Sequence, residues 1–246
     1  MAQSIVMVND FDVEKVNFLP PRPNKLGGQS VLINYVTDED NSRGGPFILQ
    51  TCRLRAPFGI DKNEQGPDGP KYHVSVSLAN EKTENVNLKA FTSNVRALDQ
   101  KTKQEPTVNS SWFGKTLSNE LVNEFYKSAE KFPKDDKWPS NLKIKLPFDR
   151  QGKPQFVLYD ENKKQVNVLD EDGNLNPDCI PKGSEMVCLI QSTGVWFVGK
   201  TQYGVGYKLL QAKLYKNSKL TGYAIVDEDE VEEEVEEEEA DEEETD

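Results

Sequence analysis

The chain has few of the residues on which enzyme active sites and metal sites most often depend. It holds one histidine, His73, and three cysteines, Cys52, Cys179 and Cys188. Any Ser-His-Asp or Cys-His arrangement would need His73, which lies in an alternating segment typical of a strand. The cysteines lack the paired spacing of a zinc site, so we expect reduced, largely buried thiols. The sequence therefore predicts a protein that is not an enzyme and uses neither a cofactor nor a metal.

Long apolar segments are also missing. The first 16 residues include an acidic residue at position 10 and lack the apolar core of a signal peptide. No stretch approaches the roughly 18 apolar residues of a membrane-spanning helix, so we expect no contact with a membrane. Together with the unpaired cysteines, these absences favour an intracellular protein.

Basic and aromatic residues are absent from the end of the chain. Residues 227–246 contain 16 Asp or Glu, no Lys or Arg and no aromatic residue. Like charges at this density repel each other and leave little that is apolar to bury, so we expect a disordered tail. The whole chain has 42 acidic and 30 basic residues, and without the 16 acidic residues of the tail the first 226 residues carry a net +4. A mildly basic body is thus joined to a polyanion.

The body contains a series of alternating apolar and polar segments that are typical of strands. One helix is expected from a cap at Thr116 or Ser118 as far as Phe132, where Pro133 ends it. Short strands with one inserted helix predict a mainly β fold, an OB-fold-like Greek-key barrel over residues 1–226. Residues 1–45 are expected to form an irregular strap on this barrel, followed at the other end of the chain by the disordered acidic tail. The predicted strands are residues 47–55, 72–78, 141–146, 156–159, 166–169, 186–191, 195–200 and 207–215.

Two motifs in the body are similar to ligand-binding loops. Residues 194–201 match every letter of the phosphate-loop pattern GxxxxGK[ST]. The four intervening residues are β-branched or aromatic, and the sequence that follows cannot open the helix that such a loop requires. Residues 170–174 begin like a calcium loop, but Leu175 and Pro181 stand where glycine and glutamate are needed. We interpret the first motif as a strand, with a turn at residues 192–194 before it, and the second as an Asp-Gly hairpin turn.

A further pattern is the interleaving of aromatic and basic residues along the strands. Proteins hold single-stranded nucleic acid with aromatic faces that stack on bases and with cations that follow the phosphates. Because alternation places either Trp196 or Phe197 in the core, each aromatic residue can be a core residue or a contact residue. The predicted nucleic-acid contacts are Arg53, Arg55, Trp112, Lys143, Lys145, Lys153, Trp196, Lys200, Tyr203, Tyr207, Lys208 and Lys213.

Residues 194–212, GVWFVGKTQYGVGYKLLQA, combined with a one-helix barrel and an acidic tail, resemble one family. It comprises the single-stranded-DNA-binding proteins of large DNA viruses of algae and amoebae, which are similar to the replication single-strand-binding protein of short-tailed coliphages. The resemblance implies an OB-fold that coats single strands in replication, recombination and repair. It also implies a tail that contacts polymerase, helicase or primase and that can help to form a homodimer. The phage tail ends in an aromatic residue and this chain does not, so the partner contact cannot be carried over in detail.

The sequence thus predicts a non-catalytic single-stranded-DNA-binding protein whose tail competes with DNA for the basic surface. The resemblance places it in the host nucleus, at a cytoplasmic viral replication site, or packaged in the virion. Two alternatives stay open, a viral structural or packaging protein and an acidic chaperone of basic proteins. Both would bury the aromatic residues or turn them towards protein, and neither would bind oligonucleotides.

Overall fold

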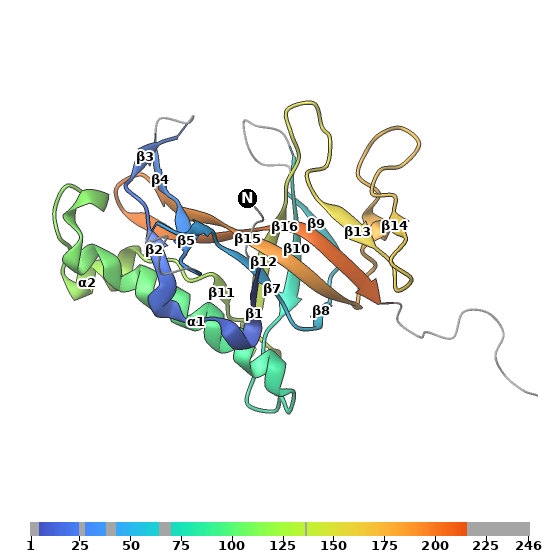
Figure 1. Cartoon of the computed structure of the whole chain (residues 1–246), viewed down its shortest axis with the longest axis horizontal. Helices are drawn as coiled ribbons and strands as arrows, with labels where there is room; N and C mark the ends of the chain where they lie inside the picture. Colours follow the sequence, from blue (N-terminus) through green and yellow to red (C-terminus); the bar gives the residue numbers. More distant parts are fainter. Residues whose placement is uncertain (1–4, 25–27, 38–42, 64–69, 136, 216–246) are drawn as a thin grey trace, which may run out of the picture. The chain divides into compact units, whose positions relative to one another are not determined.

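The computed structural model describes residues 5–24, 28–37, 43–63, 70–135 and 137–215 (Figure 1). Contacts within the chain divide it into two units, Met1–Lys216 and Asn217–Asp246. The predicted acidic tail belongs to the second unit and lies outside the described residues. The first unit is mainly β, as the sequence predicts.

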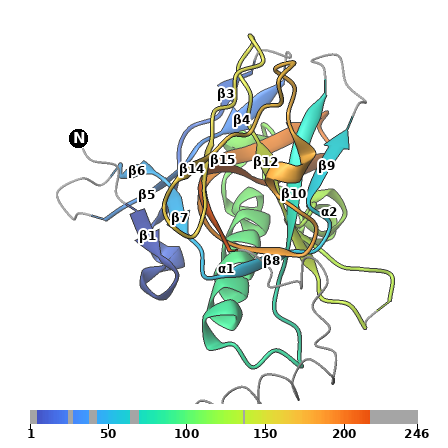
Figure 2. The same cartoon turned by 90° about the vertical axis from the view of Figure 1, so that its right-hand side faces the viewer.

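The centre of the first unit is a sheet that curls on itself. β15 (Ser184–Val198) and β16 (Gln202–Tyr215) form a long antiparallel hairpin. β16 pairs in parallel with β12 (Asn141–Leu146), which is antiparallel to β10 (Lys71–Ser77). On the other side of the hairpin β15 pairs with β8 (Leu54–Ala56), and β8 lies against β10. These five strands form a curled, partly open sheet, which agrees with the predicted OB-fold-like Greek-key barrel (Figure 2).

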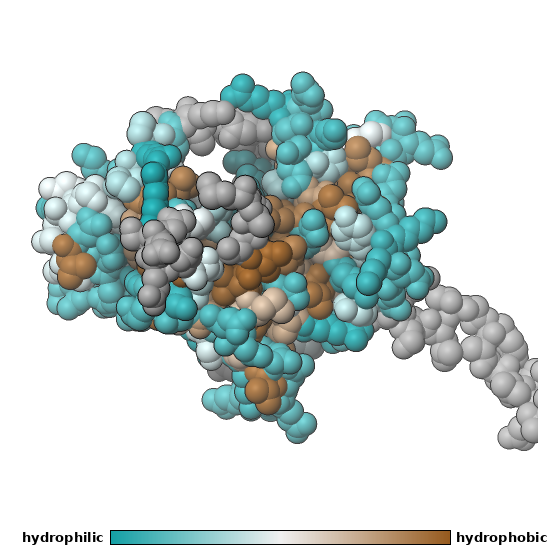
Figure 3. Space-filling model, viewed as in Figure 1, coloured by the Kyte–Doolittle hydropathy of each residue, from teal (hydrophilic) through white to brown (hydrophobic). Residues whose placement is uncertain are grey.

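Shorter elements extend and flank the barrel. The remaining strands are β1 (Ile5–Met7), β2 (Val16–Phe18), β3 (Arg22–Pro23), β4 (Gln29–Val31), β5 (Ile33–Tyr35), β6 (Gly45–Pro46), β7 (Ile48–Gln50), β9 (Ile60–Asn63), β11 (Glu130–Lys131), β13 (Val157–Tyr159) and β14 (Gln165–Val166). The 3-10 helices are η1 (Val8–Asp10), η2 (Val13–Lys15), η3 (Ser110–Trp112) and η4 (Pro177–Cys179). β1 pairs with β7 and β4 pairs with β15, while β2, β5 and β6 form a separate small sheet. Apolar residues gather around β1 and β7 in Figure 3, where Ile5 and Met7 are partly exposed.

The longest helix is one that the sequence analysis did not predict. α1 (Val86–Val108) begins where the Asn85 side chain accepts a hydrogen bond from the backbone N–H of Leu88 at 3.0 Å. Figure 1 shows α1 running below the curled sheet. Its buried residues recur at three- and four-residue spacing, which is the pattern of a helix with one face on the core. They are Phe91, Thr92, Val95, Leu98, Asp99, Thr102 and Pro106.

The predicted helix exists but is much shorter than expected. α2 (Asn119–Phe125) is capped by Ser118, one of the two predicted caps, which accepts from the backbone N–H of Leu121 at 3.4 Å. The prediction that it continues to Phe132 was wrong, as was the prediction of a single helix. The chain turns extended after Phe125 because Lys127 donates its backbone N–H to the Tyr203 carbonyl of β16 at 2.8 Å. A sheet contact with a distant strand thus outweighs the local apolar spacing.

Both motifs that are similar to ligand loops have the expected structures. Within residues 194–201, the first five belong to β15 and the rest form the turn before β16, so no helix follows. Residues 170–174 form a turn closed by a hydrogen bond from the Asp170 backbone N–H to the Asn174 carbonyl at 2.8 Å.

The three cysteines are free thiols, and two of them are buried. Over the described ranges, no helix has the length and apolar character needed to cross a bilayer, and no metal-binding cluster is found.

The predicted turn at residues 192–194 is instead a bulge inside β15. Ser192 pairs with Tyr207 and Gly194 pairs with Gly206, so Thr193 is one residue too many in the ladder. Gly194 has a φ of 90°, and a Cβ there would overlap with the Val31 carbonyl of β4. Only glycine fits this position, and the bulge therefore depends on it.

Candidate nucleic-acid interface

The bulge decides which residues of β15 face outward. Before it, the even-numbered residues from Ser184 to Ser192 are buried. After it, Val195 and Phe197 are buried and Trp196 is half-buried on the outer face. One extra residue changes the phase of a strand, because successive side chains point to opposite faces. The extra residue therefore turns Trp196 out of the barrel and Phe197 into it.

The Trp196 indole lies across two glycines of the neighbouring strand. Trp196 is paired with Gly204 on β16, and Gly206 follows at the next outward position. A Cβ on Gly204 would lie 2.8 Å from Trp196 Cζ2, and one on Gly206 would lie 3.7 Å from Trp196 Cδ1. Because glycine has no side chain, the ring packs directly on the backbone of β16. The strand supports one side of the indole, and part of the ring remains open to solvent.

A groove of about 250 Å³ opens beside this ring. Its floor is made by outward residues of β10, β12, β15 and β16, and one wall is the extended segment after α2. We call it the lysine groove; it is lined by His73, Lys127, Ser128, Ala129, Lys131, Lys143, Lys145, Thr193, Trp196, Val205, Gly206 and Tyr207. In the part of the chain that the structure describes, four lysines and no acidic side chain line it.

Two of these lysines stand on β12 and were predicted from its alternation. Lys143 and Lys145 are exposed between the buried Leu142, Ile144 and Leu146. In the ladder with β10, Lys145 pairs with His73. In the parallel ladder with β16, Lys145 pairs with Lys208, which places Lys208 on the same outer face beside the groove. The face around Trp196 is therefore strongly cationic.

His73 is the titratable group at the floor of the groove. Burial, followed by the neighbouring cations Lys143, Lys145 and Lys71, lowers its pKa to about 4, whereas Asp61 on β9 acts in the opposite direction. Its buried Nδ1 has no hydrogen-bond partner among the described residues. The imidazole is neutral at pH 7, so it adds no charge to the groove. Its position on β10 agrees with the strand expected around His73.

The wall of the groove is anchored to α1 by a buried carboxylate. Asp99 accepts hydrogen bonds from Tyr126 Oη at 2.5 Å, from the Ser128 hydroxyl, and from the Ala129 backbone N–H at 2.9 Å. Burial raises the pKa of Asp99, while these hydrogen bonds act to lower it. The unexpected helix thus fixes the segment that carries Lys127.

A second contact from α1 holds the next part of the wall. Arg96 makes a bidentate ion pair with Glu130, with both N–O distances 2.8 Å, and Ser140 donates to the same carboxylate at 2.5 Å. Burial tends to raise the pKa of Glu130, but the hydrogen bonds from Arg96 and Ser140 outweigh it and keep the pKa low. This pair positions Lys131 at the edge of the lysine groove.

Three of the predicted aromatic contacts are core residues. Trp112 is 1% exposed, Tyr203 is 0% exposed and Tyr207 is 4% exposed. Tyr203 points into the barrel and donates its hydroxyl to the Lys103 carbonyl at 2.7 Å, and Trp112 packs edge-on against Phe197. Their prediction as stacking residues was wrong, because burial leaves too little of each ring exposed to stack on a base, although Tyr207 contributes to the lining of the lysine groove. Of the predicted aromatic residues, only Trp196 keeps part of its ring at the surface.

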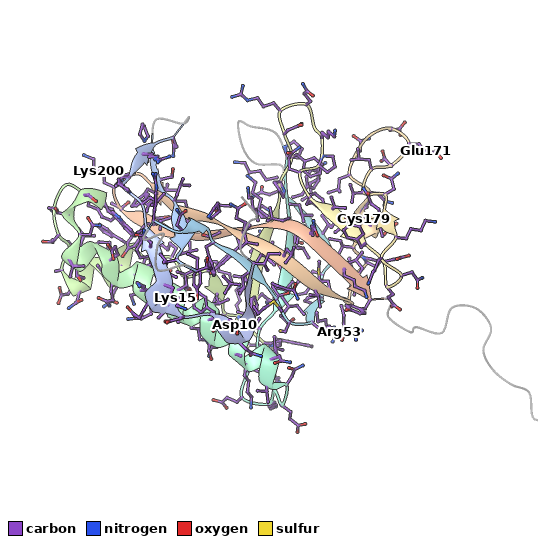
Figure 4. All side chains as sticks on the ribbon, viewed as in Figure 1. Asp10, Lys15, Arg53, Glu171, Cys179 and Lys200 are labelled. Atoms are coloured by element: carbon purple, nitrogen blue, oxygen red, sulfur yellow. The ribbon has the colours of Figure 1, made fainter. Side chains whose placement is uncertain are left out.

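The predicted basic residues do not form one site. Arg53 lies at one end of the β15–β16 hairpin and Lys200 at its tip (Figure 4). The ladder between them has 13 residue pairs, from Glu185 to Val198 on β15, and is about 40 Å long. Arg53 is also occupied, because its Nε is 2.6 Å from Glu185 and its guanidinium stacks on Tyr215 at 4.0 Å.

The other predicted cations also lie away from the lysine groove. Arg55 pairs in the ladder with Glu185, and Lys213 Nζ is 5.2 Å from the centre of the Tyr215 ring. Lys153 is exposed in a turn and lines no groove identified in the described residues. Lys200 lines a separate hollow of about 740 Å³ at the hairpin tip, together with Arg22 and Phe113.

Sequence reasoning missed two kinds of groove residue. Lys127 and Lys131 were assigned to a helix, and their role follows from contacts with α1 that no local pattern reveals. Gly204 and Gly206 contribute to the sequence prediction only as part of residues 194–212. Two glycines at outward positions of one strand, opposite a tryptophan of the neighbouring strand, would have predicted a tryptophan ring that packs on the strand backbone.

Comparisons with known proteins find likeness in structure but not in sequence. No protein-family model matches the chain, and no curated protein sequence matches it. The solved structure of gp2.5, a single-stranded DNA binding protein encoded by bacteriophage T7, covers 75% of this chain and 97% of its own, with 11% identity and a TM-score of 0.43. The single-stranded DNA-binding protein of bacteriophage Enc34 covers 87% of this chain and 98% of its own, with 10% identity and a TM-score of 0.40. The same phage protein in complex with ssDNA covers 84% of this chain and 99% of its own, with 11% identity and a TM-score of 0.42. These similarities are low, so the chemistry of the site rests on the residues of this chain alone.

Proposed function

We propose that the chain binds single-stranded DNA in the lysine groove, with Trp196 as the stacking residue. The observation that carries this proposal is the half-buried indole on its glycine support, within a groove lined by four lysines. A base can stack on the open part of the ring while its phosphates approach the ammonium groups. The main-chain support holds the ring in place, so little conformational freedom is lost on binding.

The same features favour single strands over duplexes. In a duplex the base faces are stacked on each other, and a ring on a barrel cannot reach them without opening the helix. A lysine is a flexible point charge that follows a phosphate chain without reading its sequence. The groove therefore supports binding without sequence preference.

The fluorescence of Trp196 tests this proposal directly. Titration with oligo-dT should quench tryptophan emission, and duplex DNA of equal length should quench it much less. Trp196→Ala should weaken binding by about 1–3 kcal/mol, or roughly 5- to 150-fold in Kd. Phe58→Ala is a matched control, because Phe58 is 54% exposed and lines none of the three grooves. Equal losses from both variants, or equal binding of duplex, would refute the proposal.

The alternatives from the sequence fit the groove less well. A chaperone of basic proteins needs an acidic surface, whereas this groove is cationic and would repel such clients. A packaging protein that used this face for protein contacts would leave the lysines without phosphates, so its interactions would not depend on oligonucleotides. Binding of oligo-dT in the test above separates both alternatives from DNA binding.

We further propose that this binding serves DNA replication, recombination and repair, and that residues 227–246 compete with DNA and recruit polymerase, helicase or primase. The distribution of charge supports the proposed competition: residues 227–246 contain 16 acidic residues, whereas residues 1–226 carry a net charge of +4. A tethered polyanion reaches a local concentration of about millimolar and competes well with dilute DNA. A homodimer and a nuclear, viral-factory or virion location belong to the same proposal.

Deletion of residues 227–246 tests the role of the tail. The affinity for oligo-dT should rise at low salt, and the gain should shrink as salt screens both polyanions. Pull-down of replication proteins should be lost in the same variant, and light scattering of both forms reports the homodimer. Unchanged affinity at low salt would show that the tail does not cover the DNA-binding surface.

A further inference from the structure

We infer that the bound strand continues from the lysine groove into a second groove, where its bases stack on Trp138 and Phe132. This inference rests on the proposed function and names an additional part of the binding site. The second groove has a volume of about 710 Å³. We call it the Trp138 groove; its lining residues that matter here are Lys82, Lys89, Arg96, Phe132, Lys137 and Trp138.

The aromatic residues of this groove are unusually open to solvent. Phe132 is 72% exposed and Trp138 is 68% exposed, although both side chains are large and apolar. The Trp138 backbone N–H donates to the Asp135 carbonyl at 3.1 Å, and Pro139 follows Trp138 in the sequence. Trp112, by contrast, is fully packed within the core. Exposed rings gathered at one groove are typical of a surface that binds a ligand.

The charges around these rings favour a phosphate chain as the ligand. Lys82, Lys89 and Lys137 line the groove, with Glu81 as the acidic residue among its lining. Arg96 lines it as well, but its guanidinium is already paired with Glu130. Three lysines with two open rings are the same combination of cations and aromatic faces as in the lysine groove. An apolar protein segment would have to bury these ammonium groups without a partner, which is costly.

The two grooves are joined by the elements that form them. Lys131 lines the lysine groove, and the next residue, Phe132, lines the Trp138 groove. Ser140, which directly precedes β12, lines the second groove, and Lys143 on β12 lines the first. Ser140 and Lys143 are three residues apart, about 10 Å along the chain, so both grooves lie within reach of one DNA strand, although consecutive residues such as Lys131 and Phe132 point to opposite sides of their segment.

Oligonucleotide length separates the two grooves. Oligo-dT of about 4, 8, 12 and 16 nucleotides covers the usual site sizes of an OB fold. In the full chain carrying Trp196→Phe, the responsive emission comes from Trp138, because Trp112 is buried. In the chain carrying Trp138→Phe, it comes from Trp196. We expect Trp196 to be quenched by the shortest oligomer that binds, and Trp138 to be quenched only by longer ones.

Affinity gives an independent measure of the second groove. Trp138→Ala should weaken binding of the 16-mer by roughly 5- to 150-fold and leave binding of the 4-mer unchanged. Lys89→Gln with Lys137→Gln should lower the salt slope by about 1.4 for the 16-mer alone. Lys164→Gln with Lys182→Gln is the matched control, since both residues are exposed and line neither groove.

The outcomes distinguish this inference from the proposed function. If Trp196 is quenched while Trp138 is silent at every length, the inference is wrong and the first site stands. If neither ring responds to any oligomer, the proposed function itself fails. Equal losses for 4-mer and 16-mer in Trp138→Ala would also overturn the inference, because Trp138 would then act through the fold of the first site. If a protein binds at the Trp138 groove while DNA does not quench Trp138, the exposed rings form a protein-binding surface and the inference is wrong.

Discussion

Replacing Lys143 and Lys145 by glutamine should lower both the affinity for single strands and its dependence on salt. Both side chains are exposed on β12, between three buried neighbours that carry the fold of the strand. Glutamine keeps most of the side-chain length and removes only the charge. The substitution therefore changes the electrostatics of the lysine groove and leaves the barrel intact.

The size of the effect follows from the number of phosphate contacts. On single strands each neutralised phosphate contributes about −0.7 to the slope of log K against log salt. Four lysines in the groove give a slope of about −2.8, so affinity should fall roughly 50-fold between 50 and 200 mM salt. With two lysines removed the slope should be about −1.4, and the same change of salt should cost only about sevenfold.

The assay is a fluorescence titration with oligo-dT at several salt concentrations, using oligomers short enough to occupy one groove. The matched control removes two positive charges elsewhere, with Lys164→Gln and Lys182→Gln, which lie on exposed turns. If the salt slope depended on net charge alone, both double variants would lower it equally. If the control lowers the slope as much as the groove variant does, the lysines act through the overall field and not as phosphate contacts.

Further predictions concern the glycine support and the groove histidine. Gly206→Ala should lower the unfolding temperature, because the new Cβ would overlap with Thr193 Oγ1, and adding Thr193→Ala should restore it. Gly204→Ala should destabilise by about 1–3 kcal/mol without such a rescue, since its Cβ would overlap with a backbone carbonyl; a rescue by any single side-chain change would refute this account. The imidazole signal of His73, the one histidine of the chain, should titrate by NMR at about 4 in the free protein and higher in the oligo-dT complex, because bound phosphate offsets the neighbouring lysines. As the folded pKa lies below the unfolded value of about 6.5, stability should fall as pH drops from about 6.5 to about 4 and should change little above that window; stability rising in this window would contradict the assignment.

The strands of the barrel could be predicted because alternation is a local property. β12 has the bounds that its sequence gives, and its two lysines face outward as expected. α1 was missed although Asn85 caps it and its apolar residues recur at helical spacing. Its many polar residues and Pro106 hid the pattern, because most of its stability comes from packing against the barrel and not from propensity.

The groove itself could be predicted only in part, because its wall depends on contacts between residues far apart in the chain. Asp99 and Arg96 of α1 hold Tyr126 and Glu130 some 27 to 34 residues away. Residues 126–132 have the apolar spacing of a helix, so the sequence alone predicts that α2 continues through them. Which of the two structures forms is decided by hydrogen bonds to α1 and β16 that exist only in the folded barrel.

The orientation of Trp196 shows how a single backbone feature can determine a binding face. Strict alternation from the buried Met186 and Cys188 would place Trp196 inside the barrel and Phe197 outside. Thr193 interrupts that alternation, and Gly194, at a φ of 90°, allows the interruption beneath β4. A glycine within a run of β-formers is a recognised sign of a bulge, and reading Gly194 in this way would have chosen between the two aromatic residues. The stacking residue of the proposed site is therefore specified by a glycine two positions before it, which itself lines neither groove.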